Sequence, residues 1–333
     1  MEAVTFNKSE LPAHLPPNFV LIGFASFEMR SAIVTLSVNL EQVKRAIIFH
    51  SKENEGWDSE SEDAIKSKLP SCMEYIKLDI GDPIGVGRQM TTVIKELINE
   101  NYHIVIDITT FTHETLLMLL KLVCRNKDKF ASVICLYNGA EEYSVNDPPE
   151  RVWLSKGCKE IRNVIGYPGL IRPSSKNHLI LLSGFELERA TKIITLIEPD
   201  KLTLGNAFDS VNEKHLILNK YFKNEFDRWK DSYKNITTAT FSFSCKDIEA
   251  TVAKLNEIIN ENPDDNFIIA PLNTKLSTIS TSIVALQKEK RIQVCYSVPE
   301  IYNKKNYSKP SDNITKFTLI TGNGCVSCPP IIS

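Results

Sequence analysis

The sequence predicts an α/β fold with two Rossmann-like lobes, each built on a mostly parallel sheet. From residue 18 onward, short and nearly continuous apolar runs alternate with amphipathic segments. Strands that are buried on both faces of a parallel sheet have this composition, and the helices that cover the sheet lie between them. The same alternation begins again at residue 177, after a stretch rich in Pro, Gly and Ser.

The first lobe is predicted from apolar runs and helical spacing, taken in chain order. A helix after the first strand is indicated by Ile33, Leu36 and Leu40 on one face, and a later one by Met90, Val93, Ile94 and Leu97. The expected strands cover residues 19–25, 45–51, 73–80, 102–110 and 131–137, and the expected helices cover 29–40, a short stretch before 73, 84–101 and 112–127.

The second lobe repeats this order. Its expected strands cover residues 178–185, 201–207, 236–244, 265–271 and 291–297, and its expected helices cover 186–197, 214–235, 246–262 and 277–290. We therefore expect a first lobe over residues 1–165, a linker over 166–177, a second lobe over 178–310 and an irregular tail over 311–333 that contains Cys325 and Cys328.

The two lobes also share a residue pattern at a fixed separation. A motif of two tyrosines and a glutamate follows the last strand of each lobe, and an arginine follows each first strand. Tyr137, Glu141, Tyr143 and Arg30 recur as Tyr296, Glu300, Tyr302 and Arg189, each 159 residues further along. This indicates an internal duplication, in which the lobes are expected to pack about a pseudo-two-fold axis with a shared cleft.

Composition and charge narrow the class of protein. Lys and Arg number 39 and Asp and Glu 41, which gives a net charge of −2 and disfavours an extended nucleic-acid surface. No run is long and apolar enough to span a bilayer, and no secretory signal is visible, so we expect a cytoplasmic protein without membrane contact. Several of the 8 cysteines lie in apolar runs, as buried free thiols do.

Sequence motifs for cofactors and metals are missing. The run Gly81–Gly87 precedes a helix but matches neither GxGxxG nor a P-loop, and no HExxH or GxSxG motif occurs. Cys325 and Cys328 form a lone CxxC without a second ligand pair, which favours a tail without metal. We therefore expect no metal and no resident cofactor.

Polar side chains follow the expected strands at the edge where open parallel sheets bind ligands. The strongest local signal is a turn of amide, hydroxyl and amine groups at residues 273–278, where Lys275 could hold a phosphate and Asn273 or Thr274 could equally cap the helix. Arg30 and Arg189 could contact phosphates, or pair with Glu28 and Glu188 to steady the first turn. The candidate ligand-binding residues are Ser26, Arg30, Thr109, Thr110, Arg189, Asn273, Thr274 and Lys275.

A carboxylate and an imidazole also follow the fourth strand of the first lobe. Asp107 could act as a general base, or could cap a helix or pair with an arginine. His113 and Glu114 at the next helix start could transfer protons, or could form a plain surface pair. These three residues are the catalytic candidates.

The architecture and the turn Asn273-Thr274-Lys275 resemble the CARF and SAVED sensor domains of prokaryotic antiviral systems. The turn is similar to the Thr-Gly-Gly-Thr-Lys turn of CARF domains, although its glycines are absent here and the first lobe has no lysine at that place. The resemblance covers about residues 18–307. It implies a cyclic oligonucleotide ligand. Because no effector domain is recognisable, it also implies either an effector on a separate chain or a protein that degrades the signal itself.

Three functions remain open from the sequence. The first is a sensor or binding subunit for a nucleotide-type small molecule, held in the interlobe cleft. The second is an enzyme acting on a nucleotide or sugar phosphate through Asp107, His113 or Glu114, which predicts shifted pKa values beside one lobe's edge. The third is a scaffold subunit of a larger complex, which predicts a broad exposed apolar patch.

Overall fold

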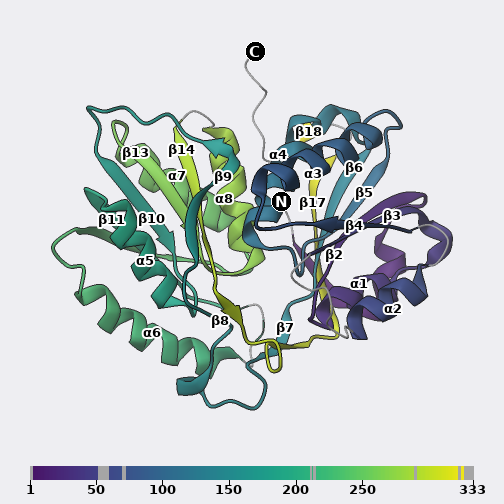
Figure 1. Cartoon of the computed structure of the whole chain (residues 1–333), viewed down its shortest axis with the longest axis horizontal. Coiled ribbons are helices and arrows are strands. Elements are labelled where there is room, and N and C mark those ends of the chain that lie inside the picture. Colours follow the sequence, from purple (N-terminus) through teal and green to yellow (C-terminus); the bar gives the residue numbers. More distant parts are fainter. Residues whose placement is uncertain are drawn as a thin grey trace. The chain divides into compact units, whose positions relative to one another are not determined.

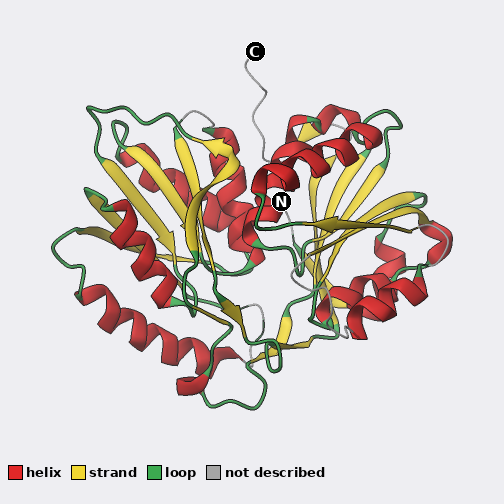
Figure 2. Cartoon of the chain, viewed as in Figure 1, coloured by secondary structure: helices red, strands yellow, loops and turns green. Residues whose placement is uncertain are grey.

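A computed structural model of the chain describes residues 3–51, 60–69, 73–210, 212, 215–288, 291–321 and 324–325. The chain divides into two compact units. Unit 1 comprises residues 1–142 and 308–333, and unit 2 comprises residues 143–307. Helices and strands alternate in both, as Figures 1 and 2 show, so the predicted α/β class with mostly parallel sheets is confirmed.

Unit 1 is built on a sheet with the order β1-β17-β6-β5-β2-β3-β4, and β18 pairs with β17. Strands β2 to β6 are mutually parallel, whereas β17 runs antiparallel to both β6 and β1. The elements are β1 (Val4–Asn7), β2 (Phe19–Ala25), α1 (Arg30–Ser37), β3 (Val43–Ser51), α2 (Glu60–Lys68), β4 (Met73–Leu78), α3 (Pro83–Leu97), β5 (His103–Asp107), α4 (His113–Arg125), β6 (Ser132–Tyr137), β7 (Ala140–Tyr143), β16 (Ser308–Pro310), β17 (Asn313–Thr321) and β18 (Gly324–Cys325).

Unit 2 is built on a sheet with the order β12-β11-β10-β13-β14-β9. Strands β10 to β14 are parallel and β9 is antiparallel to β14. The elements are β8 (Ser155–Lys156), β9 (Glu160–Pro168), β10 (Asn177–Leu182), α5 (Leu187–Ile197), β11 (Lys201–Ala207), α6 (Leu216–Asp231), β12 (Thr237–Phe243), α7 (Ile248–Glu261), β13 (Asn266–Pro271), α8 (Lys275–Gln287), β14 (Ile292–Val298) and β15 (Ile301–Tyr302).

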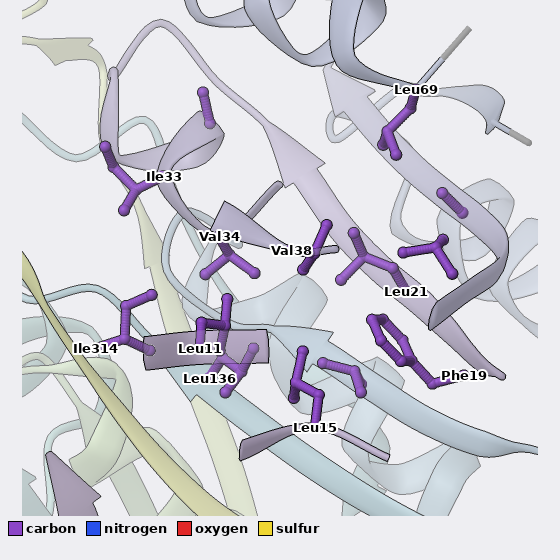
Figure 3. Close-up of a cluster of buried hydrophobic side chains, with 14 of the residues drawn as sticks. Leu11, Leu15, Phe19, Leu21, Ile33, Val34, Val38, Leu69, Leu136 and Ile314 are labelled. Carbon is purple, nitrogen blue, oxygen red and sulfur yellow. The ribbon is translucent and has the colours of Figure 1, made fainter. Parts of the chain in front are cut away.

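The apolar core of unit 1 lies between one face of the sheet and the first helices. Alternate residues of β2, such as Phe19 and Leu21, belong to the same buried cluster as Ile33 and Val34 of α1 (Figure 3). Leu11, in a 3₁₀ turn over Lys8–His14, packs into the same cluster. In unit 2, alternate residues of β10 and β11 pack in the same way against α5 and α6. Burial of both sheet faces explains why these strands are continuous apolar runs.

Three boundaries differ from the sequence prediction. The expected first lobe over 1–165 is too long, because residues 143–165 belong to unit 2. The prediction of an irregular tail from residue 311 is wrong, because Asn313–Thr321 forms β17 inside the sheet of unit 1. Polar residues such as Thr315 and Lys316 interrupt its apolar side chains, which concealed the strand. The expected linker over 166–177 is also partly strand, since β9 extends to Pro168 and only residues 169–176 lie between β9 and β10.

Within the described part of the chain, no helix is both long and apolar enough to span a bilayer. The shared strand order of the two units is compatible with the predicted internal duplication, which stays a prediction.

Candidate functional site

In each unit the carboxyl ends of all the parallel strands lie along the same edge of the sheet, which is distinct from its two outermost strands. The strand order reverses direction between β2 and β5 in unit 1, and between β10 and β13 in unit 2. Helices that follow the two strands at such a reversal leave on opposite faces, and ligands of open α/β sheets bind in the crevice that results. All of the predicted ligand-binding residues follow β2, β5, β10 or β13, the four strands that flank these two reversals.

In unit 1, three predicted hydroxyl-bearing residues gather at the reversal. Thr110 Oγ1 donates to the carbonyl oxygen of Phe24 at 2.5 Å and so joins the end of β5 to the end of β2. Thr109 Oγ1 accepts from the backbone N–H of Asn138, at the end of β6, at 3.0 Å. Ser26 is buried, and its backbone N–H donates to Ser31 Oγ at 3.3 Å. The structure thus brings Ser26, Thr109 and Thr110 to one edge.

Asp107 closes β5 and is 4% exposed. Its Oδ1 accepts hydrogen bonds from Thr109 Oγ1 at 2.5 Å and from the backbone N–H of Thr109 at 3.0 Å. Burial raises the pKa of Asp107 from 3.8 to about 7, although the Thr109 hydrogen bonds and the charge of Arg30 act in the opposite direction. Both protonation states are therefore accessible near neutral pH, which is the property a general acid or base needs.

His113 and Glu114 begin α4, which Thr112 caps by accepting from the backbone N–H of Thr115 at 3.1 Å. Glu114 is buried, so the alternative of a plain surface pair is wrong for this residue. A carboxylate in the first turn interacts favourably with the helix dipole. That arrangement gives Glu114 a structural reason to be there, whether or not it also transfers protons.

Arg30 is held in a buried cluster in unit 1. Its Nη2 lies 2.7 Å from Glu28 Oε2, and Nη1 donates to the carbonyl oxygen of Asn138 at 3.3 Å. Ser308 binds both partners: its Oγ accepts from Arg30 Nε at 2.9 Å and donates to Glu28 Oε2 at 2.5 Å. The predicted charge pair of Arg30 with Glu28 is confirmed.

Arg189 occupies a corresponding cluster in unit 2. Its Nη1 lies 2.6 Å from Glu186 Oε2, and Nη2 donates to the carbonyl oxygen of Ser297. Ser155 Oγ donates to Glu186 Oε1. The predicted pairing of Arg189 with Glu188 is wrong: the ion pair is to Glu186, and Glu188 Oε2 instead accepts from the backbone N–H of Gly157 at 3.4 Å.

The guanidinium of Arg189 stays charged in this environment. Burial by itself lowers the pKa of Arg189, but the charge of Glu186, together with Tyr296, Tyr302 and the Glu186 hydrogen bond, outweighs it and raises the pKa above its usual value. Both arginines donate several hydrogen bonds to carboxylates, backbone carbonyls and serine hydroxyls of their own unit. We therefore assign them to positioning the edge.

The turn with the strongest sequence signal, Asn273-Thr274-Lys275, lies at the strand-order reversal of unit 2. Asn273 Nδ2 donates to the carbonyl oxygen of Ser183 at 2.7 Å, which joins the end of β13 to the end of β10. Thr274 is the N-cap of α8 and accepts from the backbone N–H of Ser277 at 3.3 Å. The predicted capping role of Thr274 is confirmed. Lys275 is the first residue of α8 and is half-buried.

Sequence reasoning missed several residues at these edges. Cys245 donates through Sγ to Asn273 Oδ1 at 3.0 Å, and its backbone N–H donates to Asp209 at 2.5 Å. Burial raises the pKa of the Cys245 thiol to about 12, so it acts as a packed thiol and not as a nucleophile. Ser155 and Ser308 were missed because their partners lie far away in the sequence.

Gly184 provides one local signal for the second reversal. A Cβ at this position would collide with the carbonyl oxygen of Leu272, so the chain after β10 approaches the end of β13 closely enough to require glycine. Among the described residues, no group of three or more His, Cys, Asp or Glu side chains is arranged to hold a metal ion. The side chain of Cys325 and all of Cys328 lie outside the described residues.

No protein-family model and no curated protein matches the chain. Among solved structures, Delta-pyrroline-5-carboxylate dehydrogenase from Mycobacterium tuberculosis aligns with a TM-score of 0.23 and 7% sequence identity, over 99% of this chain and 67% of that one. A TM-score this low does not indicate a common fold, and the likeness carries no information about function.

Proposed function

We propose that the chain is a binding protein for a nucleotide-type small molecule, with its anionic group at the strand-order reversal of unit 2. The observation that carries the proposal is the placement of Asn273, Thr274 and Lys275. Asn273 ties β13 to β10, Thr274 caps α8, and Lys275 is the first residue of that helix. A helix start favours anions, and a lysine beside it adds a point charge suited to phosphate.

The corresponding edge of unit 1 has a different chemistry. The hydroxyl groups there belong to Ser26, Thr109 and Thr110. In addition, β5 ends in Asp107, whereas the corresponding strand of unit 2, β13, ends in Pro271. Hydroxyls and a carboxylate suit the neutral polar groups of a nucleotide, such as ribose hydroxyls, better than its phosphates. In this proposal Arg30 and Arg189 hold the two edges in shape.

The resemblance to CARF and SAVED domains selects the first ligand class to test. In those families the ligands are cyclic oligonucleotides that signal viral infection. We extend the proposal to a sensor of this class in antiviral defence, which passes the signal to an effector protein on a separate chain.

A second candidate function is supported by Asp107 alone. A carboxyl group with a pKa of about 7 at the edge of a parallel sheet can take a proton from a substrate hydroxyl or return one to a leaving group. On this alternative the chain turns over a nucleotide or sugar phosphate. Neutral Asp107 is equally able to donate a hydrogen bond to a bound ligand without any reaction.

A thermal-shift screen of the full chain tests the proposal. The panel holds linear and cyclic mono-, di-, tri- and tetranucleotides, NAD and ATP. A ligand at about a hundred times its Kd adds about 2.7 kcal/mol to the free energy of unfolding, which raises Tm measurably. Chromatography of each stabilising compound after incubation then separates a sensor, which returns it unchanged, from an enzyme. If no compound raises Tm, the binding proposal fails and the scaffold alternative takes its place.

A further inference from the structure

Six strands of the unit 1 sheet correspond in order to the six strands of the unit 2 sheet, whereas β1 and β18, which both pair with β17, have no counterpart in unit 2. Reading from one edge, unit 1 runs β4-β3-β2-β5-β6-β17 and unit 2 runs β12-β11-β10-β13-β14-β9. In each case five parallel strands are followed by one antiparallel strand. The parallel strands of each unit are consecutive in the sequence. The antiparallel strand of unit 1, β17, comes long after β6, whereas that of unit 2, β9, directly precedes β10.

By its place in the sequence, each antiparallel strand belongs to the half of the chain that forms the other sheet's parallel strands. β9 follows the parallel strands of unit 1 in the sequence, yet it pairs with β14 of unit 2. β17 follows the parallel strands of unit 2, yet it pairs with β6 of unit 1. If the chain is divided in the exposed stretch 170–174, the first half supplies β9 to the sheet of the second half. The second half supplies β17 to the sheet of the first.

The two exchanged strands begin their pairing at equivalent positions, although it differs further along, where Pro168 lies opposite Gln293 and Thr318 lies opposite Ile134. Thr315 of β17 lies opposite Tyr137, and Arg162 of β9 lies opposite Tyr296, which is the residue 159 positions after Tyr137. The neighbouring pairs agree: Lys316 lies opposite Leu136, and Asn163 opposite Cys295. Repeated elements are expected to share these first pairs, because the register of a strand is set by its hydrophobic pattern and by the turn that leads into it.

The short strands and the arginine clusters repeat the exchange. β7 of the first half pairs with β16 of the second, and β15 of the second half pairs with β8 of the first, so both short pairings join the two halves. Ser308, from the second half, binds Glu28 of the first. Ser155, from the first half, binds Glu186 of the second.

From these relationships we infer that the chain is a covalently joined pair of repeats that exchange their last strand reciprocally. Each half completes both the sheet and the arginine cluster of the other. Exchange of an identical element is how two copies of one protein become interlocked. It follows that neither half is complete alone, since β6 or β14 would present an unpaired edge of buried residues. The inference does not depend on any ligand.

Hydrogen exchange on the full chain tests the connectivity with a matched pair of variants. Asn163→Pro in β9 and Lys316→Pro in β17 occupy equivalent register positions, opposite Cys295 and Leu136. Proline removes a backbone donor and distorts the pairing around it. We expect amides of β14 to exchange at least about tenfold faster in the first variant and amides of β6 to do so in the second. Loss of protection in β6 from Asn163→Pro would overturn the inference.

A disulfide provides a second test that does not rely on the proline variants folding. In a Cys158→Ser background, Glu160→Cys with Val298→Cys places two thiols at directly paired positions of β9 and β14. A protease site is inserted between Pro173 and Ser174, in the exposed stretch. After cleavage, a non-reducing gel should retain a single band of full mass.

The matched control pairs Glu160→Cys with Gly139→Cys, which is 159 residues before Val298 and would face residue 160 if β9 had stayed with its own repeat. Both thiols of this control lie on the same side of the cut, so we expect two bands. Separation of the fragments in the Val298→Cys variant would also overturn the inference, whatever the outcome of ligand screening.

Discussion

Arg30 Nη2 lies 2.7 Å from Glu28 Oε2, and the two side chains are only 5% and 8% exposed. The pair is therefore buried, and Ser308, the first residue of β16, hydrogen-bonds to both side chains. A buried ion pair of this kind need not stabilise the fold in net terms, but removing one partner leaves an uncompensated buried charge.

We expect Arg30→Met to lower the free energy of unfolding by about 3–5 kcal/mol, because it leaves the Glu28 carboxylate without its cation. The double variant Glu28→Leu/Arg30→Met should cost clearly less than the single one, since it removes both charges. Chemical denaturation followed by circular dichroism measures both. The matched surface control is Arg45→Met, whose partners Glu74 and Glu96 are about half exposed and whose loss should cost at most about 1 kcal/mol.

Asp107 should make stability depend on pH in a direction opposite to that of most carboxylates. Its folded pKa of about 7 lies above the unfolded value, so between about pH 4 and pH 7 the folded state binds more protons than the unfolded one. Stability should therefore fall as the pH rises through this window and become constant above it. Asp107→Asn removes this contribution.

The measurement is the difference in unfolding free energy between the wild type and Asp107→Asn at a series of pH values. We expect the wild type to lose stability relative to the variant as the pH rises from about 4 to about 7. A difference that stays flat over that window would show that Asp107 titrates at its ordinary pKa.

The predictability of the fold follows from how deeply each strand is buried. β2, β5 and β13 are buried along almost their whole length, so their apolar runs are continuous and the sequence predicts them. β9 lies at a sheet edge, buries only Val164 and Tyr167, and includes Gly166 and Pro168, so its pattern resembles a linker. Strand exchange depends on pairing between residues far apart in the sequence, such as Tyr137 with Thr315, and leaves no local pattern.

The site shows the same division between local and distant determinants. Capping by Thr274 follows from residues within one helical turn, and the sequence predicts it. The Arg30 cluster instead depends on Ser308, which is 278 residues away. The two glutamates near Arg189 likewise have distant partners, since Glu186 accepts from Ser155 and Glu188 from the backbone N–H of Gly157.

Two glycines should respond in opposite ways to alanine. At Gly184 a Cβ would collide with the carbonyl oxygen of Leu272, so Gly184→Ala should force the ends of β10 and β13 apart and destabilise unit 2. At Gly87, inside α3, an added Cβ would have no heavy atom within 4 Å, and Gly87→Ala should stabilise unit 1 by about 0.5–1 kcal/mol. Thermal denaturation of both variants distinguishes them, and a lowered Tm for Gly87→Ala would contradict the helix interior assigned to it.

Lys275 should separate ligand binding from stability. If it contacts the anionic group, Lys275→Gln should weaken binding of the nucleotide that gives the largest thermal shift by about tenfold or more, the equivalent of one charge-assisted hydrogen bond. Isothermal titration calorimetry at two salt concentrations measures the loss and its electrostatic part. The Tm of the unliganded protein should change little, because capping of α8 rests on Thr274.

Lys288, at the other end of α8, provides the matched control. It carries the same charge and its Nζ donates to Asn260 Oδ1 at 3.1 Å, far from the strand-order reversal along a helix of 13 residues. Lys288→Gln changes the net charge by the same amount, so it reports the general electrostatic attraction of an anion. Equal losses of affinity in the two variants would remove Lys275 from the site, whereas a loss confined to Lys275→Gln places the anion at the start of α8.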